Sequence, residues 1–263
     1  MSVIRHDADR LLAHLHLDRE SPSLEYLHRI VREHQLRVPF ETLSKLIDYE
    51  PGLRRGDFMP PFDVYVDRIV ARGAGGLCWT LARGLQVLLD DLGFDASLMY
   101  MDPGHCCVRV DLDRPYYADV GYAAPLFAAY PLFESFVLET HRETFDYRVD
   151  GQEIVVVRTP GPTKRLDPAP RRLEDFHDRI DAANDWSAAF SFLHRLSYSA
   201  YVDGDFTSLR DGLLTRRRPD GAVTEPVAPG DEPRVLAEVF GADPMLYVEA
   251  EAVHRRYHRA PEP

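Results

Sequence analysis

The spacing of hydrophobic residues changes near Gly93, and this change is the feature that most constrains the fold of the chain. Before it, apolar residues recur at helical spacing, as at Leu81, Leu85 and Leu88. From about residue 94 to residue 160, apolar and polar residues alternate with period two, and short turn motifs separate the segments. The sequence therefore predicts helices first and then several consecutive strands, which is typical of an antiparallel sheet or barrel.

The same patterns predict individual elements along the chain. We expect helices at 22–34, 63–70 and 78–92, strands at 96–101, 105–112, 116–120, 145–149 and 153–159, and a proline-rich crossing linker at 160–172. After the linker we expect helix over 173–201, a hairpin near 219–221, a helix over 232–240 and a polar, frayed end.

The charge of the chain bears on its partners. Its 263 residues carry a formal net charge of −12, which disfavours nucleic acid as the main partner. The basic run 216–218 is interpreted as a solvated turn, although a subsidiary role toward phosphates stays open. No apolar run reaches about 18 residues and the first residues lack a signal-peptide core, so we expect no membrane span and a cytoplasmic location.

Three cysteines, Cys78, Cys106 and Cys107, suggest a thiol enzyme. Their number is odd and two are adjacent, which fits neither a disulfide framework nor the spacing of a zinc site. We expect no metal. A single reactive cysteine with a distant histidine and aspartate fits an intracellular thiol enzyme better.

Local geometry favours Cys78, His105 and Asp119 as the reactive group. If 105–112 and 116–120 form a hairpin that turns at 112–113, His105 lies opposite Asp119, with Cβ atoms ~4.5–5.5 Å apart. Cys78 follows a glycine-rich loop at the start of the 78–92 helix, where the helix dipole lowers the pKa of a thiol. A thiol, an imidazole and a carboxylate are the groups that covalent acyl chemistry on cysteine requires.

The other two cysteines are weaker candidates. Alternation in the 105–112 strand places Cys106 on the apolar face, where we expect a small core residue. Cys107 shares the opposite face with His105 and stays open as a less favoured nucleophile. Taken alone, each of Cys78, His105 and Asp119 could also be an ordinary structural residue with no catalytic role.

Three sequence blocks resemble the arylamine N-acetyltransferase family. Residues 34–43 read H-Q-L-R-V-P-F-E-T-L, close to the family's H-x-x-x-x-P-F-E-N-L. Residues 72–78 read R-G-A-G-G-L-C, close to R-G-G-x-C. His105 and the segment Y-A-D-V-G-Y at 117–122 are similar to the family's histidine strand and its D-V-G-F-G turn.

The resemblance implies a role for each matching residue. Cys78 would be the nucleophile that is acylated, His105 its base, and Asp119 the residue that orients the histidine. Phe40, Gly121 and Tyr122, with the rest of the 120–123 loop, would line the substrate pocket. Structural support would come from Arg72 and Glu41, which could pair as a polar brace.

The family also implies a fold and a reaction. The fold class is α+β: a helical domain at 1–92, a β-barrel at 93–172 and an α/β lid at 173–263, with a core like that of cysteine proteases and transglutaminases. Acetyl-CoA or another acyl thioester would acylate the cysteine in a ping-pong reaction. A small-molecule amine would then take the acyl group, and an acyl carrier protein is a possible partner.

The chain departs from the family pattern beside its nucleophile. The family continues C-F-E-x-N, whereas this chain reads Cys78-Trp79-Thr80-Leu81-Ala82 and so lacks both polar side chains. The glycine loop is longer, and Ala123 replaces the last glycine of D-V-G-F-G. We therefore expect an acyltransferase with a non-standard donor or acceptor. A biosynthetic amide synthase that uses a larger carrier-bound acyl chain, a thiol hydrolase and a catalytically silent homologue stay open as alternatives.

Overall fold

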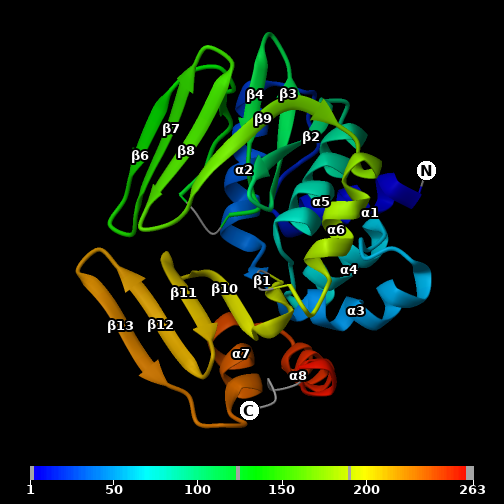
Figure 1. The fold of residues 1–263 in the computed structure, drawn as a ribbon, viewed down its shortest axis with the longest axis vertical. Helices are drawn as coiled ribbons and strands as arrows, with labels where there is room; N and C mark the ends of the chain where they lie inside the picture. The colour runs from blue at the N-terminus through cyan, green and yellow to red at the C-terminus, as the bar shows by residue number, and fades with distance from the viewer. Residues whose placement is uncertain (1–2, 123–124, 189–190, 259–263) are drawn as a thin grey trace. The chain divides into compact units, whose positions relative to one another are not determined.

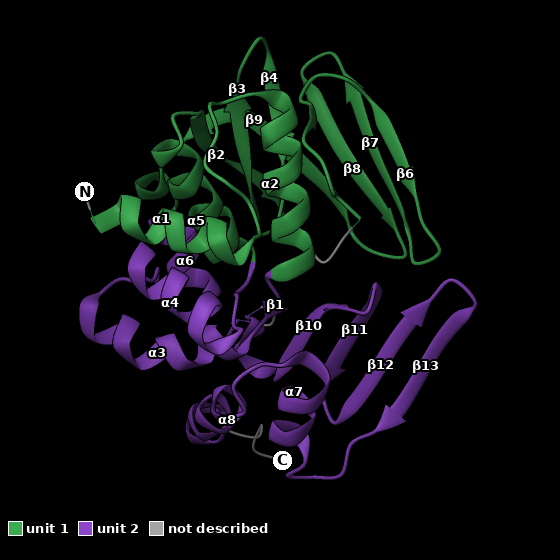
Figure 2. Ribbon diagram, turned by 180° about the vertical axis from the view of Figure 1, so that it is seen from behind, with its two compact units in different colours: residues 1–37, 78–176 green, residues 38–77, 177–263 purple. Residues whose placement is uncertain are grey.

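A computed structural model describes residues 3–122, 125–188 and 191–258 of the chain (Figure 1). The chain forms two compact units that interleave in sequence, residues 1–37 with 78–176 and residues 38–77 with 177–263 (Figure 2). Helices and antiparallel sheets occur in both units, in agreement with the mixed α and β class. The division into three consecutive domains stays a prediction.

The first unit is built on an eight-stranded antiparallel sheet with the strand order β5-β4-β3-β2-β9-β8-β7-β6. The sheet curls, so that β6 to β8 turn away from β2 to β4 (Figure 1). Its strands are β2 (Asp95–Asp102), β3 (His105–Asp111), β4 (Pro115–Ala118), β5 (Tyr130–Pro131), β6 (Phe136–Glu139), β7 (Thr144–Asp150), β8 (Glu153–Thr159) and β9 (Thr163–Arg171). Its helices are α1 (Val3–His14), α2 (Leu24–Arg37) and α5 (Cys78–Asp91), with a 3-10 turn, η1 (Leu173–Phe176).

Helix α5 lies on β2 and β3, the part of the sheet that follows it in the chain. Leu81, Leu85 and Leu88 of the helix are fully buried or nearly so, as their helical spacing predicts. A separate apolar cluster packs on the curled side of the sheet and includes Met99, Tyr117 and Phe145. The central strands are therefore covered on both faces, which fixes their register and makes them a rigid base for side chains.

The second unit contains a five-stranded antiparallel sheet with the order β1-β10-β11-β12-β13. Its strands are β1 (Phe40–Glu41), β10 (Ser197–Val202), β11 (Asp205–Arg210), β12 (Leu213–Arg218) and β13 (Gly221–Pro226). Its helices are α3 (Leu43–Arg55), α4 (Phe62–Arg72), α6 (His177–Ala183), α7 (Glu232–Phe240) and α8 (Met245–Tyr257), with a 3-10 turn, η2 (Phe192–His194). Its core joins α3, α8 and the sheet through residues such as Leu46, Leu209 and Leu246.

The strand predictions for 96–159 are confirmed to within a few residues, whereas the linker predicted at 160–172 is wrong. Most of it forms β9, between β2 and β8. Asp167 of β9 pairs with Tyr100 of β2, and Arg171 pairs with Leu98. Between these two pairs, three residues of β9 (168–170) therefore lie opposite a single residue of β2. This bulge holds two prolines that cannot donate to a ladder, and it lets a proline-rich segment remain a strand.

The predictions for the C-terminal third are correct in part. The hairpin near 219–221 and the helix at 232–240 are confirmed, and the helix ends before Gly241. The helix predicted over 173–201 is wrong beyond residue 183, because 197–202 forms β10, which pairs with distant β1 on one side and with the next strand, β11, on the other. The prediction of a frayed C-terminal end is wrong for residues 245–257, which form α8. Residues 259–263 lie outside the described part of the chain.

The glycine loop before Cys78 requires glycine at position 75. A Cβ atom there would lie 2.0 Å from the carbonyl oxygen of Pro39, a backbone atom that cannot move aside by a side-chain rotation. We predict that Gly75→Ala lowers the free energy of unfolding by about 3 kcal/mol. Gly56→Ala is the control, because its Cβ would meet nothing within 4 Å and only the positive φ of 68° opposes it.

Gly56→Ala should lower the free energy of unfolding by about 1 kcal/mol, which is the penalty for placing a non-glycine residue in a left-handed conformation. Urea unfolding of the two variants and the parent protein measures both values. Equal losses for the two variants would contradict the close approach of Gly75 to Pro39.

Candidate active site

Cys78 is the first residue of α5, and only 8% of its surface is exposed. Its Sγ lies 3.7 Å from the carbonyl oxygen of Gly104 and within hydrogen-bonding reach of the His105 side chain. The backbone N–H groups in the first turn of a helix have no partners within the helix, and they favour negative charge nearby. The thiol thus lies where a helix start and an imidazole both stabilise a thiolate.

Asp119 follows β4 and is 1% exposed, and its carboxylate accepts three hydrogen bonds. The donors are Nε2 of His105 at 2.7 Å, the hydroxyl of Tyr117 at 2.6 Å and the backbone N–H of Gly121 at 2.8 Å. The side-chain amide of Gln35 donates to the backbone carbonyl of Asp119 at 3.0 Å. A buried carboxylate is costly unless it is paired. These donors offset its burial and fix its position.

The imidazole of His105 is held from two directions. Its Nε2 is bonded to Asp119, so Nδ1 is the ring nitrogen left for the thiol of Cys78. The ring of Tyr122 stacks on the imidazole, with centroids 3.8 Å apart and planes inclined by 16°. Together these contacts define both the direction and the plane of the imidazole.

The electrostatics of the site favour a charged pair. Burial lowers the pKa of His105, but the charge and the hydrogen bond of Asp119, helped by Cys78, raise it to about 9. Burial raises the pKa of the Cys78 thiol, but the hydrogen bond and the charge of His105 outweigh this effect and lower it below its ordinary value. Both shifts have the sign that favours thiolate and imidazolium, the reactive form of a cysteine nucleophile.

The predicted hairpin register is wrong by two residues. Val108 pairs with Ala118 and Asp111 pairs with Pro115, so the turn spans 112–114. Pro115 lacks a backbone N–H and occupies the first position of its strand, which lengthens the turn.

The contact between His105 and Asp119 survives this change. The ladder of β3 and β4 ends at Ala118, so the two residues do not lie directly opposite each other. A shift of two residues keeps every side chain on its original face of the sheet. Both residues therefore still point to the same side, where they bond at 2.7 Å.

Gly121 and Tyr122, which were predicted to line the substrate pocket, lie against Cys78 and His105. A Cβ atom on Gly121 would lie 2.8 Å from Cα and 2.9 Å from Cβ of Cys78, so only glycine fits against the nucleophile. Tyr122 is 8% exposed and covers His105. Their contact with substrate stays a prediction, and Ala123 of the same loop lies outside the described residues.

Cys106 and Cys107 are both fully buried. Cys106 is a core residue, as predicted, but the assignment of Cys107 to a non-core face is wrong, because the curled side of the sheet is also apolar. Burial raises the pKa of both thiols well above the ordinary value. Burial and the raised pKa therefore both disfavour Cys107 as the reactive thiol.

Phe40, Glu41 and Arg72 belong to the second unit. The carboxylate of Glu41 accepts hydrogen bonds from the backbone N–H groups of Ser44 at 2.9 Å and Gly75 at 3.1 Å. Phe40 forms an isolated β-bridge with Gly76. Phe40 and Glu41 thus both hold the loop that leads to Cys78. The structural role of Glu41 thus acts on the loop backbone, and the role of Phe40 in a pocket stays a prediction.

The predicted brace between Arg72 and Glu41 is not formed. Arg72 instead donates to Asp243 at 2.7 Å and to Glu249 at 3.0 Å, which tie the end of α4 to the C-terminal helical segment. The longer glycine loop changes the distance along the chain between Arg72 and the nucleophile, and acidic partners near α8 satisfy the guanidinium.

Sequence reasoning missed two residues of the site, Tyr117 and Gln35. Tyr117 lies two positions before Asp119 in a strand segment, so the period of two was a signal that both point to one side. Gln35 lies in the H-Q-L-R-V-P-F-E-T-L block, but a contact across 84 residues of chain leaves no local pattern.

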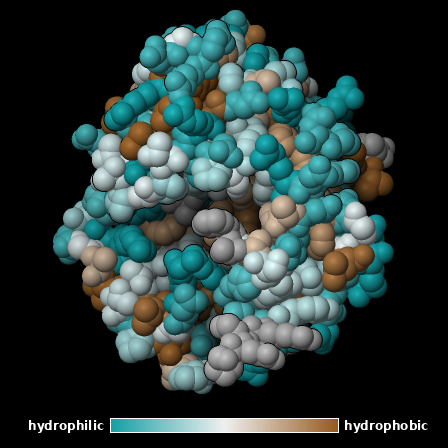
Figure 3. Space-filling view, in the orientation of Figure 1, coloured by the Kyte–Doolittle hydropathy of each residue, from teal (hydrophilic) through white to brown (hydrophobic). Residues whose placement is uncertain are grey.

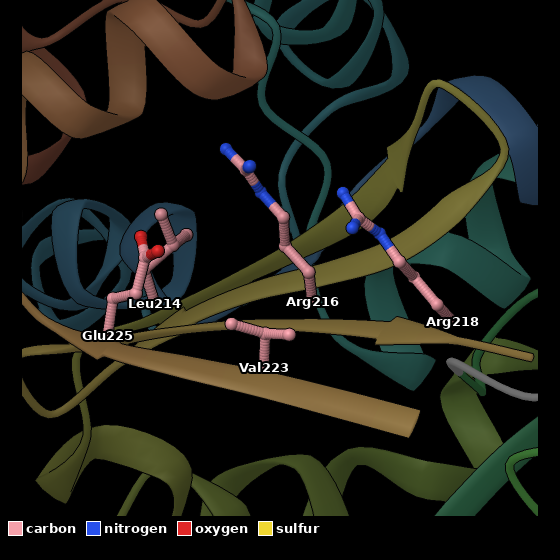
Figure 4. A pocket seen from close by; sticks show the side chains of 5 residues that line it. All are labelled: Leu214, Arg216, Arg218, Val223 and Glu225. Atoms are coloured by element: carbon pink, nitrogen blue, oxygen red, sulfur yellow. The ribbon is translucent and has the colours of Figure 1, made fainter. Parts of the chain in front are cut away.

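The basic run 216–218 lies in strand β12, so its interpretation as a turn is wrong. Arg216 and Arg218 project from one face of the hairpin into a hollow lined also by Leu214, Val223 and Glu225 (Figure 4). Arg218 pairs with Asp205 at 2.8 Å. None of the predicted site residues lines this hollow.

Two further findings concern metals and membranes. Within 3–122, 125–188 and 191–258, no three His, Cys, Asp or Glu side chains are grouped so that they could hold a metal ion. In the same ranges, every helix is too short or too polar to cross a lipid bilayer. The face drawn in Figure 3 is mainly hydrophilic, with small scattered hydrophobic patches.

Comparison with known proteins agrees with the motifs. The model of a family described as N-acetyltransferase matches residues 23–243. Among curated proteins, none is a significant sequence match to this chain. The fold is similar to several solved arylamine N-acetyltransferases at low sequence identity.

Three of these structures cover nearly the whole chain. The Salmonella typhimurium enzyme is 19% identical, with 98% of this chain and 100% of that chain covered and a TM-score of 0.74. The Mycobacterium marinum enzyme, solved in complex with CoA, is 18% identical, with 94% and 99% covered and a TM-score of 0.74. A Bacillus cereus enzyme described as having a Cys-His-Glu triad is 18% identical, with 92% and 100% covered and a TM-score of 0.73.

The site geometry predicts an activated thiol at position 78. The rate of alkylation by iodoacetamide should show an inflection well below the ordinary thiol value of about 8.5, because His105 stays cationic at neutral pH. Asp119→Asn should move the inflection upward, because a neutral amide does not stabilise the imidazolium. Peptide mapping assigns the label, with Cys106 and Cys107 as internal controls that should stay unmodified in the folded protein. A parent inflection near 8.5 would contradict the ion pair.

Proposed function

Because the chain belongs to the arylamine N-acetyltransferase family as a divergent member, we propose that it transfers an acyl group from a CoA-type thioester, through Cys78, to an arylamine-like nitrogen. The observation that carries the proposal is the buried trio of Cys78, His105 and Asp119, with its 2.7 Å bond between imidazole and carboxylate. The CoA complex of the Mycobacterium marinum enzyme supports a CoA thioester as donor. The carboxylate of the Bacillus cereus Cys-His-Glu triad supports an acidic residue in the third position.

In the first half of the reaction, the thiolate of Cys78 attacks the carbonyl carbon of the donor thioester. The tetrahedral intermediate collapses, the bond to the CoA sulfur breaks, and the acyl group remains on Cys78. The leaving thiolate takes the proton from Nδ1 of His105 and departs as free CoA. Asp119 keeps the imidazole oriented through Nε2 and stabilises its charged form.

In the second half, the amine nitrogen attacks the acyl carbon on Cys78. His105, now neutral, accepts the proton that the amine loses as the new carbon–nitrogen bond forms. The bond to Cys78 breaks, and the amide leaves with thiolate and imidazolium restored. The two halves follow each other at one thiol, so a ping-pong scheme results.

The finer parts of the proposal come from the family resemblance. They are a core like that of cysteine proteases and transglutaminases, a C-terminal lid, and a pocket that includes Phe40, Gly121 and Tyr122. The cytoplasmic location is proposed from the sequence and not from the resemblance. The acyl donor is the most open of these points, because Thr80 and Ala82 stand where the family has Glu and Asn. A test with several donors is therefore more informative than a test with acetyl-CoA alone.

We expect the intact mass of the protein to increase by one acyl group after exposure to a cognate thioester, and to return to the parent value when an arylamine is added. Cys78→Ala should abolish this increase in mass, because the other two thiols are fully buried and burial raises their pKa. Cys107→Ala is the matched control and should keep it. The panel contains acetyl-CoA, longer acyl-CoA thioesters and acyl-pantetheine mimics of a carrier protein.

The outcomes separate the alternatives. Acylation by long-chain or carrier-type donors alone would favour an amide synthase. Loss of the acyl group to water, with no amide formed, would favour a hydrolase. Acylation of the Cys78→Ala variant, or none of the parent protein by any donor, would overturn the proposal.

A further inference from the structure

A buried ion cluster lies where β7 begins and β8 ends, in the same unit as the candidate active site. Glu143, immediately before β7, accepts from Nη2 of Arg142 at 3.0 Å with one oxygen and from Nε of Arg158 at 2.8 Å with the other. The Glu143 side chain is 5% exposed and that of Arg158 is 16% exposed. A guanidinium held by a buried carboxylate has a fixed position.

The guanidinium of Arg158 lies over the ring of Tyr122, with its central carbon 4.6 Å from the ring centroid. The imidazole of His105 already stacks on this ring at 3.8 Å, so the guanidinium covers the other face. Phe145 meets the ring at 73°, and the Tyr122 hydroxyl lies 3.7 Å from Sδ of Met101. Tyr122 is thus enclosed, and Arg158 provides the side that faces away from His105.

We infer that Arg158, anchored by Glu143, is a positioning residue that holds Tyr122 against His105 and so keeps Nδ1 of the imidazole directed at Cys78. The inference rests on the proposed function, since it assigns a role within that same site. It concerns Arg158 and Glu143, which no motif of the sequence had singled out.

The physical need for such a residue follows from the geometry of His105. A single hydrogen bond at Nε2 fixes one point of the imidazole but leaves its plane free to tilt. Stacking on a fixed ring removes this freedom. The π-face of a tyrosine attracts a cation on either side, so guanidinium and imidazolium both favour the stacked arrangement. Small errors in the placement of a reacting group lower rates strongly.

Several other charged or titratable groups surround the site and bear on any pH profile. They are Cys78 of α5, Tyr117 of β4, Asp119 after β4 and Lys164 of β9, which donates to the carbonyl of Pro103. None of them touches the outer face of Tyr122 in the contacts described. A change at Arg158 therefore acts on His105 through the tyrosine ring.

The test compares Arg158→Met with Arg148→Met. Arg148 lies on neighbouring β7, pairs with Asp146 at 2.8 Å, and its side chain is 63% exposed. It is a matched control because, within the described residues, no aromatic ring lies against its guanidinium. Three quantities are measured for each variant: the pH inflection of Cys78 alkylation, kcat for acyl transfer and KM for acyl transfer. We expect Arg158→Met to move the inflection toward the ordinary thiol value and to lower kcat about tenfold, with KM close to the parent value. Arg148→Met should change neither.

A double-mutant cycle distinguishes positioning from general stability. Tyr122→Leu should reproduce the effect of Arg158→Met, and the double variant should lose no more than either single variant, because both break the same stack. Glu143→Gln preserves side-chain volume and should shift the inflection in the same direction by a smaller amount, which secures the test if Arg158→Met folds poorly.

The inference is overturned if Arg158→Met and Glu143→Gln both keep the parent inflection and kcat, whatever their melting temperatures, or if the effects of Arg158→Met and Tyr122→Leu are additive. Alkylation needs no acyl donor. A parent protein that has an activated Cys78 but forms no acyl-enzyme would therefore sink the proposed function and leave the positioning role of Arg158 standing.

Discussion

The site depends on one buried carboxylate, Asp119. Removing a carboxylate from water costs several kcal/mol unless donors replace the lost hydration. Three donors do so here, one each from His105, Tyr117 and Gly121. Each bond has a second effect. The bond from His105 directs the imidazole, the bond from Tyr117 anchors the end of β4, and the bond from Gly121 shapes the turn that passes against Cys78. The remaining features of the site are consequences of satisfying this one buried charge.

Charge balance links this carboxylate to the thiol. Asp119 raises the pKa of His105, and the resulting imidazolium lowers the pKa of Cys78 against the effect of its burial. The start of α5 contributes in the same direction. Apolar layers on both faces of the central strands exclude water and hold the groups in place. Cys106 and Cys107 lie beside His105 in β3, but burial, together with the negative charge of Asp119, raises the pKa of both thiols.

Local sequence patterns were sufficient to predict that His105 and Asp119 are neighbours but not their pairing register, and Cys78 was assigned to the same site by its chemistry and by the family resemblance. The period of a strand fixes which face a side chain takes, so the error of two residues in register did no harm. Tyr117 could have been found by the same rule. By contrast, β9, β10 and the pairing of Arg72 with Asp243 and Glu249 depend on partners distant in the chain. Neither the proline content of 160–172 nor the helix-like composition of 173–201 could reveal these contacts.

The most direct test of the central claim is the charge of His105 itself. In protein labelled with nitrogen-15 at histidine, the ring nitrogens of His105 should both be protonated at neutral pH and should titrate with a pKa of about 9. In Asp119→Asn the same ring should titrate much closer to the ordinary value of about 6.5. A neutral His105 ring in the parent protein at neutral pH would contradict the thiolate–imidazolium pair on which the account rests.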